Sequence, residues 1–202
     1  VALLLSRLLD PDEGEVLIDG KNLKHHNLKV YRANIGFIPQ ESYLFSDTIE
    51  NNIGFALDHP SHKLVEEVAK TADVHRNIMG FKKKYETVVG ERGVMLSGGQ
   101  KQRICIARAL LTKPKILIFD DCLSAVDTKT EEEILTNLGE IMSGKTSILI
   151  AHRISTIKNA DKIIVLEGGE IIEQGTHSEL LDNNGAYAEM YDNQLIEEES
   201  KV

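Results

Sequence analysis

The sequence predicts an α/β fold in which a mainly parallel sheet carries an inserted helical lobe. Short apolar runs, of the kind found in strands buried on both faces, support the sheet. These runs are Ile35–Ile38, Ile116–Phe119 and Thr146–Ala151. A change of composition after Gln40, followed by helical periodicity, supports the lobe.

The predicted helical subdomain takes residues 41–113, and the α/β core takes residues 1–40 and 114–202, all within one domain. Between Ser61 and about Met79, apolar residues recur on one helical face: Leu64, Val65, Val68, Ala69 and Ala72. The subdomain also holds the helix that starts at Ser97, so its content is mainly helical.

Composition limits the class of protein. The 202 residues are 42% hydrophobic, which is enough for a substantial core and argues against disorder. The net charge of −9 argues against a general nucleic-acid-binding surface, so we expect no nucleic-acid partner. Cys105 and Cys122 suggest reduced thiols in a cytoplasmic setting, because two cysteines do not make a disulfide scaffold.

The first 40 residues begin with a helical pattern that has no visible start. Val1–Leu9 lacks an N-cap and a preceding turn, so we expect the chain to be a piece of something longer. Glu15–Asp19 predicts a strand that Asp19-Gly20 turns back. Gln40 directly follows the strand stopped by Pro39, where an amide can coordinate a metal or orient a water. The alternative is a solvated loop glutamine.

The segment from Ser97 predicts an anion-binding helix start. Ser97 followed by Gln100 is a capping-box pattern, and Gly98 and Gly99 leave the first turn without side chains. An anionic group can therefore approach the free N–H groups and the positive end of the helix dipole. The helix runs to about Thr112. The alternative is an ordinary cap and turn.

Asp120 and Asp121 end the strand that follows this helix. Taken alone, two acids after an apolar run indicate an exposed loop. Together with the predicted anion site they indicate phosphate and magnesium chemistry, because carboxylate oxygens are the ligands that Mg²⁺ prefers.

The last third of the sequence also contains a residue that we predict to belong to the site. Asp127 and Thr128 can cap a helix that begins with Glu131, Glu132 and Glu133 and ends before Gly144. His152 follows the strand Thr146–Ala151, at the edge where open α/β sheets bind ligands. A hairpin around Gly168-Gly169, two short helices and a frayed acidic tail, residues 197–202, complete the prediction.

These residues resemble the nucleotide-binding domain of ATP-binding-cassette (ABC) transporters over essentially all 202 positions. LSGGQ at Leu96–Gln100 resembles the family signature, and ILIFDD resembles the Walker B strand. Gln40 is similar to the Q-loop glutamine, Ser124–Asp127 to the D-loop and His152 to the switch histidine. Further stretches resemble the exporter branch: LFSDTIENNI at Leu44–Ile53, TVVGERG at Thr87–Gly93 and GTHSELL at Gly175–Leu181.

The resemblance implies a P-loop ATPase-type core that uses ATP and Mg²⁺, and a second such domain that closes on it head to tail. Ser97, Gly98, Gly99 and Gln100 would hold the γ-phosphate of the partner's ATP. At the chain's own nucleotide, the resemblance implies Asp120 and Gln40 as magnesium residues, His152 as a contact of the γ-phosphate, Asp121 in the position of the catalytic base, and Asp127 as a further nucleotide-binding residue.

The same resemblance implies a membrane partner. The chain would lie at the cytoplasmic face of a membrane, against the transmembrane domain of the transporter. Glu91 and Arg92 would face that domain, and Glu41–Phe45 would lie near the coupling contact. Closure of the pair would drive export across the membrane.

Two departures from the family pattern matter. The sequence contains no G-x-x-x-x-G-K-[ST] phosphate loop, which by the pattern belongs just before Val1 together with its strand. The family has Asp-Glu where this chain has Asp120-Asp121, so the usual glutamate base is replaced. Three functions remain open: a hydrolysing exporter subunit, a largely non-hydrolysing partner in a heterodimer, which Asp121 favours, and a soluble ABC ATPase that transports nothing.

Overall fold

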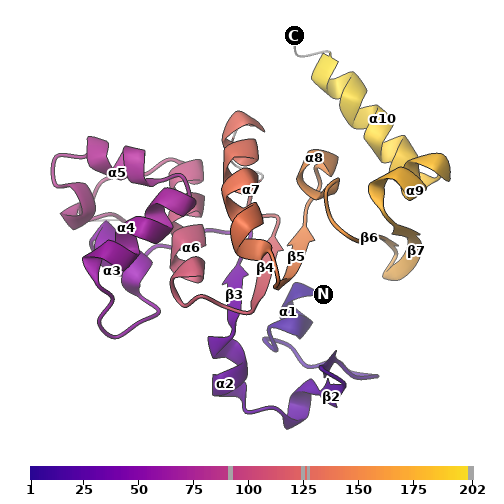
Figure 1. The fold of residues 1–202 in the computed structure, drawn as a ribbon, viewed down its shortest axis with the longest axis horizontal. Helices are drawn as coiled ribbons and strands as arrows, with labels where there is room; N and C mark the ends of the chain where they lie inside the picture. Colours follow the sequence, from indigo (N-terminus) through magenta and orange to yellow (C-terminus); the bar gives the residue numbers. More distant parts are fainter. Residues whose placement is uncertain (91–92, 124–125, 127, 200–202) are drawn as a thin grey trace. The chain divides into compact units, whose positions relative to one another are not determined.

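The computed structural model describes residues 1–90, 93–123, 126 and 128–199. The chain divides into two compact units, Val1–Leu149 and Ile150–Val202, which are described separately (Figure 1). The finer division of the sequence into an α/β core and a helical subdomain, residues 41–113, remains a prediction.

The central sheet has the order β3-β4-β5, from β3 (Ile35–Ile38), β4 (Ile116–Asp120) and β5 (Thr146–Ile150). β3 and β4 are parallel, with Ile38 opposite Phe119, so the predicted parallel sheet is confirmed. A Cβ at Gly36 would lie 2.8 Å from Pro114 Cγ and 3.1 Å from the Ala109 carbonyl oxygen. Glycine therefore lets β3 approach the end of the helix that precedes β4.

β5 is less buried than its apolar sequence predicts. Its first residue is exposed and the other four are only half-buried, so the prediction of a strand buried on both faces is wrong here. β5 is the last strand in the order of this sheet among the residues that the structure describes, and an edge strand is covered less than a central one.

Four helices pack together beside this sheet (Figure 1). They are α3 (Ile49–Gly54), α4 (His62–Thr71), α5 (His75–Gly80) and α6 (Gly98–Leu111). The predicted helical pattern of residues 61–79 is divided between α4 and α5, because Asp73 has a φ of 51° and ends the run. Ile53, Val65, Ile104 and Leu117 share one buried apolar core with α7 (Thr128–Met142), whose end before Gly144 was predicted.

The chain before the sheet is short and irregular. It contains α1 (Ala2–Leu5), the hairpin of β1 (Leu17–Ile18) and β2 (Lys21–Asn22), a 3₁₀ turn over Leu23–His25, and α2 (Leu28–Ala33). The predicted helix Val1–Leu9 is wrong in length, because Arg7 has a φ of 51° and ends the helical path after Ser6.

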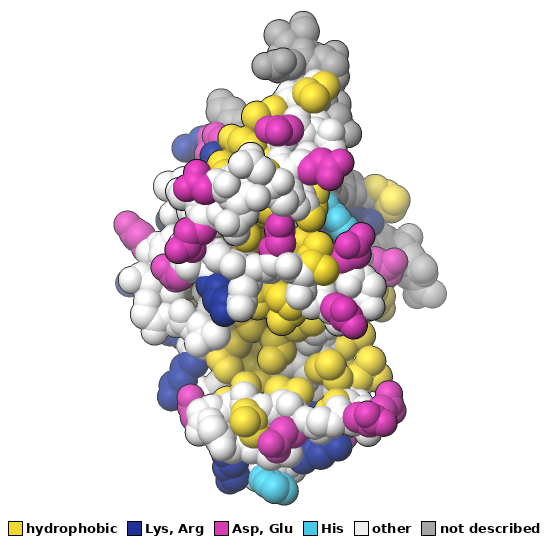
Figure 2. All heavy atoms as spheres, turned by 90° about the vertical axis from the view of Figure 1, so that its right-hand side faces the viewer, with side chains coloured by type: hydrophobic (Ala, Val, Ile, Leu, Met, Phe, Trp, Pro, Cys, Tyr) yellow, Lys and Arg dark blue, Asp and Glu magenta, His cyan; other side chains and the backbone are white. Residues whose placement is uncertain are grey.

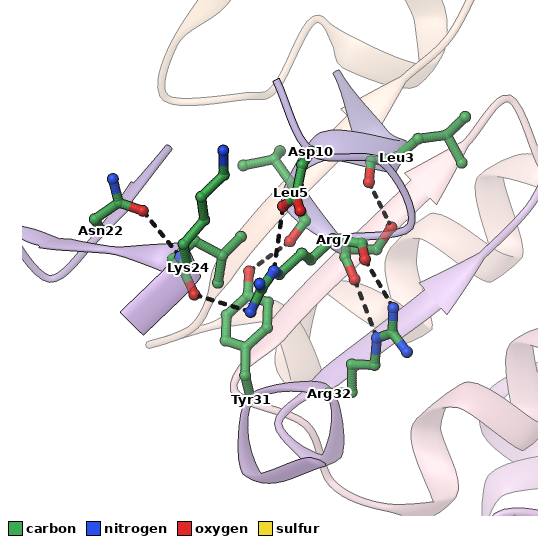
Figure 3. Close-up of polar contacts among 10 residues, drawn as sticks. Leu3, Leu5, Arg7, Asp10, Asn22, Lys24, Tyr31 and Arg32 are labelled. Carbon is green, nitrogen blue, oxygen red and sulfur yellow. Dashed lines mark hydrogen bonds and ion pairs between the residues drawn. The ribbon is translucent and has the colours of Figure 1, made fainter. Parts of the chain in front are cut away.

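Side chains of α2 hold the end of α1 (Figure 3). The Tyr31 hydroxyl donates to the Leu5 carbonyl at 2.5 Å. Arg32 donates from Nη2 to the Arg7 carbonyl at 2.7 Å and from Nε to the Ser6 carbonyl at 3.4 Å. The last carbonyls of a helix have no partner within it, so these side chains supply the donors that a further helical turn would otherwise provide.

The second unit is built on the hairpin of β6 (Ile163–Glu167) and β7 (Glu170–Gly175), which confirms the predicted hairpin. Gly168 and Gly169 both have positive φ, as a two-residue hairpin turn requires. With α8 (Ile154–Ile157), α9 (His177–Asp182) and α10 (Ala186–Glu199), the hairpin encloses a small core: Ile154, Ile163, Leu180 and Tyr187.

α10 corrects two predictions. The helix has 14 residues, so the second of the two final helices is not short. It continues to Glu199, so residues 197–199 are helical where a frayed tail was predicted. None of the helices in the described parts of the chain is long and apolar enough to cross a bilayer.

Several large apolar side chains remain exposed, and Figure 2 shows hydrophobic side chains at the surface. On the hairpin, Leu166 is 52% and Ile171 58% exposed. Acidic side chains are also visible in the same view.

Replacing Tyr31 with phenylalanine tests the contact at the end of α1. Tyr31 is buried, and burial raises its pKa, so its hydroxyl is a neutral donor at physiological pH. Tyr31→Phe leaves the Leu5 carbonyl without this donor and is expected to lower the free energy of unfolding by about 1 kcal/mol in a urea titration. Tyr43→Phe changes an exposed ring and is the matched control. Equal losses in the two variants would contradict the assignment.

Candidate nucleotide-binding site

Two polar side chains meet where neighbouring parallel strands end. Gln40 comes two residues after β3, and Asp121 comes directly after β4. Gln40 Nε2 donates to Asp121 Oδ2 at 2.9 Å. The proximity of these residues follows from the parallel register, in which Ile38 lies opposite Phe119.

Asp121 turns the chain sharply out of β4. Its φ is 46°, in the left-handed region that aspartate tolerates better than most residues. The next two residues, Cys122 and Leu123, are buried, so the half-buried Asp121 carboxylate is followed directly by residues of the apolar core. Burial, reinforced by the neighbouring Asp121 and Asp120 carboxylates, raises the pKa of the Cys122 thiol to about 12.

The donor set fits Mg²⁺ bound mainly by phosphate oxygens. Asp120, the half-buried last residue of β4, offers a carboxylate. The Gln40 amide nitrogen binds Asp121, so the amide oxygen is the atom that Gln40 offers a cation. Among the described residues, no group of three or more His, Cys, Asp and Glu side chains could hold a metal ion. One or two protein oxygens completed by phosphate and water are the usual arrangement for Mg²⁺.

The start of α6 has the predicted geometry. Ser97 Oγ accepts from the Gln100 N–H at 3.2 Å, and Gln100 Oε1 accepts from the Ser97 N–H at 3.0 Å, which completes the capping box. Ser97 and Gly98 are exposed, so the N-terminal end of a 14-residue helix is open to a ligand.

The signature segment is distant from Gln40 along α6. Arg108, in the last turn of α6, binds the backbone of Tyr43, only three residues after Gln40. Ser97 precedes Arg108 by eleven residues, or about 16 Å along a helix axis. The structure therefore brings Gln40 and Asp121 together and keeps Ser97–Gln100 apart from them.

The remaining predicted residues lie in the second unit or outside the residues that the structure describes. His152 is exposed after β5 and belongs to the second unit, where its carbonyl accepts from Gln194 Nε2 at 2.7 Å. Asp127 and most of the Ser124–Asp127 stretch lie outside the residues that the structure describes, as do Glu91 and Arg92. Their roles remain predictions.

Sequence reasoning missed Arg108 and Asn52. Arg108 binds Asn52 of α3 over 56 positions of sequence and Tyr43, in the segment after Gln40, over 65 positions. No spacing rule connects them. The one available signal was an arginine in the last turn of an otherwise largely buried helix.

An α/β domain whose parallel strands end in an amide and paired carboxylates, and which also contains a helix with an open N-terminus, has the features of a nucleotide-binding domain. Residues 1–124 match the sequence family described as ABC transporter, and the chain belongs to this family.

The chain is also similar to individual ABC exporters. The chain is 47% identical over 98% of its length to an ATM1-type heavy metal exporter of Novosphingobium aromaticivorans, and 46% identical over 93% of its length to a mitochondrial iron-sulfur clusters transporter, ATM1, of Gibberella zeae. It spans 32% and 27% of those relatives. A solved bacterial Atm1-family ABC exporter with ATP bound matches 96% of this chain and 34% of its own, with 47% identity and a TM-score of 0.92.

The thiol beside the paired acids gives a direct test of this geometry. Burial raises the pKa of Cys122 to about 12 and also raises that of Cys105, so neither is a thiolate near neutral pH. Iodoacetamide is expected to leave both unmodified in the native chain and to alkylate both in guanidinium, as measured by mass spectrometry of peptides. Rapid native labelling of Cys122 would show that the turn at Asp121 is open.

Proposed function

We propose that this chain is the ATP-binding domain of an ABC exporter and hydrolyses ATP to drive export across a membrane. The observation that carries the proposal is the Gln40–Asp121 contact beside Asp120, in a chain that also presents an open, capped signature helix. The 47% identity to an exporter solved with ATP bound supports the same nucleotide for this chain.

In the proposed assembly, two such domains close head to tail. Ser97 and the N–H groups around Gly98 and Gly99 bind the γ-phosphate of the partner's ATP, where the helix start favours negative charge. Gln40 and Asp120 hold Mg²⁺, which neutralises phosphate charge when bound. Asp121 orients the attacking water, while His152 and Asp127 complete the nucleotide contacts.

The membrane partner would be the transmembrane domain of the same transporter, with this chain at its cytoplasmic face. Exposed aromatic side chains support a docking surface close to the nucleotide site. Tyr43 is 67% and Phe55 62% exposed, and Tyr43 comes three residues after Gln40. An exposed aromatic surface of this kind suits an apolar or amphipathic partner segment.

One observation favours a second form of this function, a heterodimer with one weak site. Asp121 is one methylene shorter than glutamate, and Gln40 already binds its carboxylate. A base displaced by about 1 Å can lose on the order of 10²-fold in rate. This chain's signature would then serve a partner's site that keeps a glutamate, while its own site mainly holds ATP.

Substitution of the signature serine in the full-length transporter tests the proposed function. Ser97→Arg places a bulky side chain where the phosphate should bind and is expected to lower ATPase turnover by about 10²-fold in reconstituted vesicles. Ser61→Arg, at the exposed N-cap of α4, is the matched control and should retain turnover. Full turnover in Ser97→Arg would remove the signature from the mechanism.

The Asp121 position separates the symmetric from the asymmetric form. In the asymmetric form, Asp121→Asn changes turnover little, because the competent site uses the partner's glutamate. Asp121→Glu is expected to raise turnover by restoring the longer base. Loss of activity in Asp121→Asn as complete as in Ser97→Arg would show that Asp121 is itself a working base.

The 202-residue chain alone is expected to bind Mg-ATP poorly, because its sequence holds no phosphate loop. That loop supplies the N–H groups and the lysine that grip the β- and γ-phosphates. Isothermal titration with Mg-ATP is the measurement. Binding in the micromolar range would show that Gln40, Asp120 and the rest of the chain suffice.

A further inference from the structure

Arg108 makes three hydrogen bonds from the last turn of α6. Its Nε donates to the Asn52 carbonyl at 2.7 Å, its Nη2 to Asn52 Oδ1 at 3.1 Å and its Nη1 to the Tyr43 carbonyl at 3.0 Å. One guanidinium therefore joins the signature helix to α3 and to the segment that follows Gln40.

Asn52 extends this connection into the loop before α3. Its side chain is 1% exposed and accepts from the Phe45 N–H at 2.9 Å. Its amide nitrogen donates to the carbonyls of Phe45 and Thr48, each at 3.0 Å. The loop from Phe45 to Thr48 thus closes around one amide, which Arg108 holds in place.

The guanidinium also lies against two aromatic rings. It is 5.6 Å from the ring centroid of Phe45 and 6.0 Å from that of Phe55. The two rings stack at 4.4 Å, and Tyr43 meets Phe45 edge-on at 5.2 Å. We call Tyr43, Phe45 and Phe55 the aromatic surface.

The short segment from Gln40 to Phe45 is held at both ends. At one end Gln40 binds Asp121, beside the predicted magnesium site. At the other end, Arg108 binds Tyr43, and Asn52 binds Phe45. The five residues after Gln40 therefore connect the aromatic surface to the nucleotide site.

The chemistry of Arg108 is costly for a purely structural contact. Burial lowers its pKa, and its hydrogen bonds go to uncharged oxygens. A half-buried cation without an acid in these bonds contributes little to the stability of a fold. The contribution of Arg108 is to hold several backbone and side-chain acceptors in a fixed arrangement, because its guanidinium is a rigid planar fork of donors.

We propose that Arg108 is a positioning residue that sets the aromatic surface relative to the signature helix and transmits docking of the membrane domain to the nucleotide site. This inference rests on the proposed exporter function. Lysine keeps the charge and the contact with the rings but cannot bind the Tyr43 and Asn52 acceptors with a planar fork.

The experiment is Arg108→Lys in the full-length transporter in lipid vesicles. The KM for ATP is expected to remain unchanged, while transport-substrate stimulation of turnover falls about tenfold, since hydrogen bonds that join α6 to α3 and to Tyr43 are lost. Arg103→Lys is the matched control, because Arg103 is a second arginine of α6 but donates to Asn77 Oδ1 of α5 at 3.0 Å. It should keep normal stimulation.

The outcomes separate this inference from the function on which it rests. No ATPase activity in the unmodified transporter would remove the proposed function. Normal activity with unchanged stimulation in Arg108→Lys would remove only the role of Arg108, as would losses in both lysine variants that follow their losses in Tm. If Arg108→Lys does not fold, Phe45→Leu decides: weakened stimulation at unchanged KM supports the inference, and full stimulation overturns it.

Discussion

The parallel pairing of β3 with β4 is the constraint on which the candidate site depends. Parallel strands end at the same edge of a sheet, so residues 81 positions apart, Gln40 and Asp121, meet without any local signal between them. The close approach at Gly36 allows this pairing to lie against the end of α6. The helix that carries the signature is thus fixed to the sheet that carries the acids.

Those parts of the fold that follow local rules were predictable from the sequence. Apolar runs located β3 and β4, Gly168-Gly169 located the hairpin, and Ser97 with Gln100 located the start of α6. Single left-handed residues were not predictable, because the sequence around Arg7 and Asp73 contains no glycine that would mark such a position. They shortened α1 and divided one predicted helix in two.

The candidate site shows the same division between local and distant information. Residue types at the ends of strands indicated Gln40, Asp120 and Asp121, because the chemistry of each is visible in its own side chain. Arg108 and Asn52 act through partners far away in sequence, so only the folded chain shows their connection. The apolar sequence of β5 likewise could not reveal that its neighbours leave it half-buried.

The capping box alone does not explain why residue 97 is a serine. Aspartate caps a helix as well as serine does, so the stability of α6 does not distinguish the two residues. They differ in what they present outward: an ionised carboxylate repels an approaching anion and only accepts, whereas the hydroxyl that accepts from Gln100 still has a proton to donate. Serine at this position therefore suits the proposed phosphate contact, whereas the helix cap alone would accept either residue.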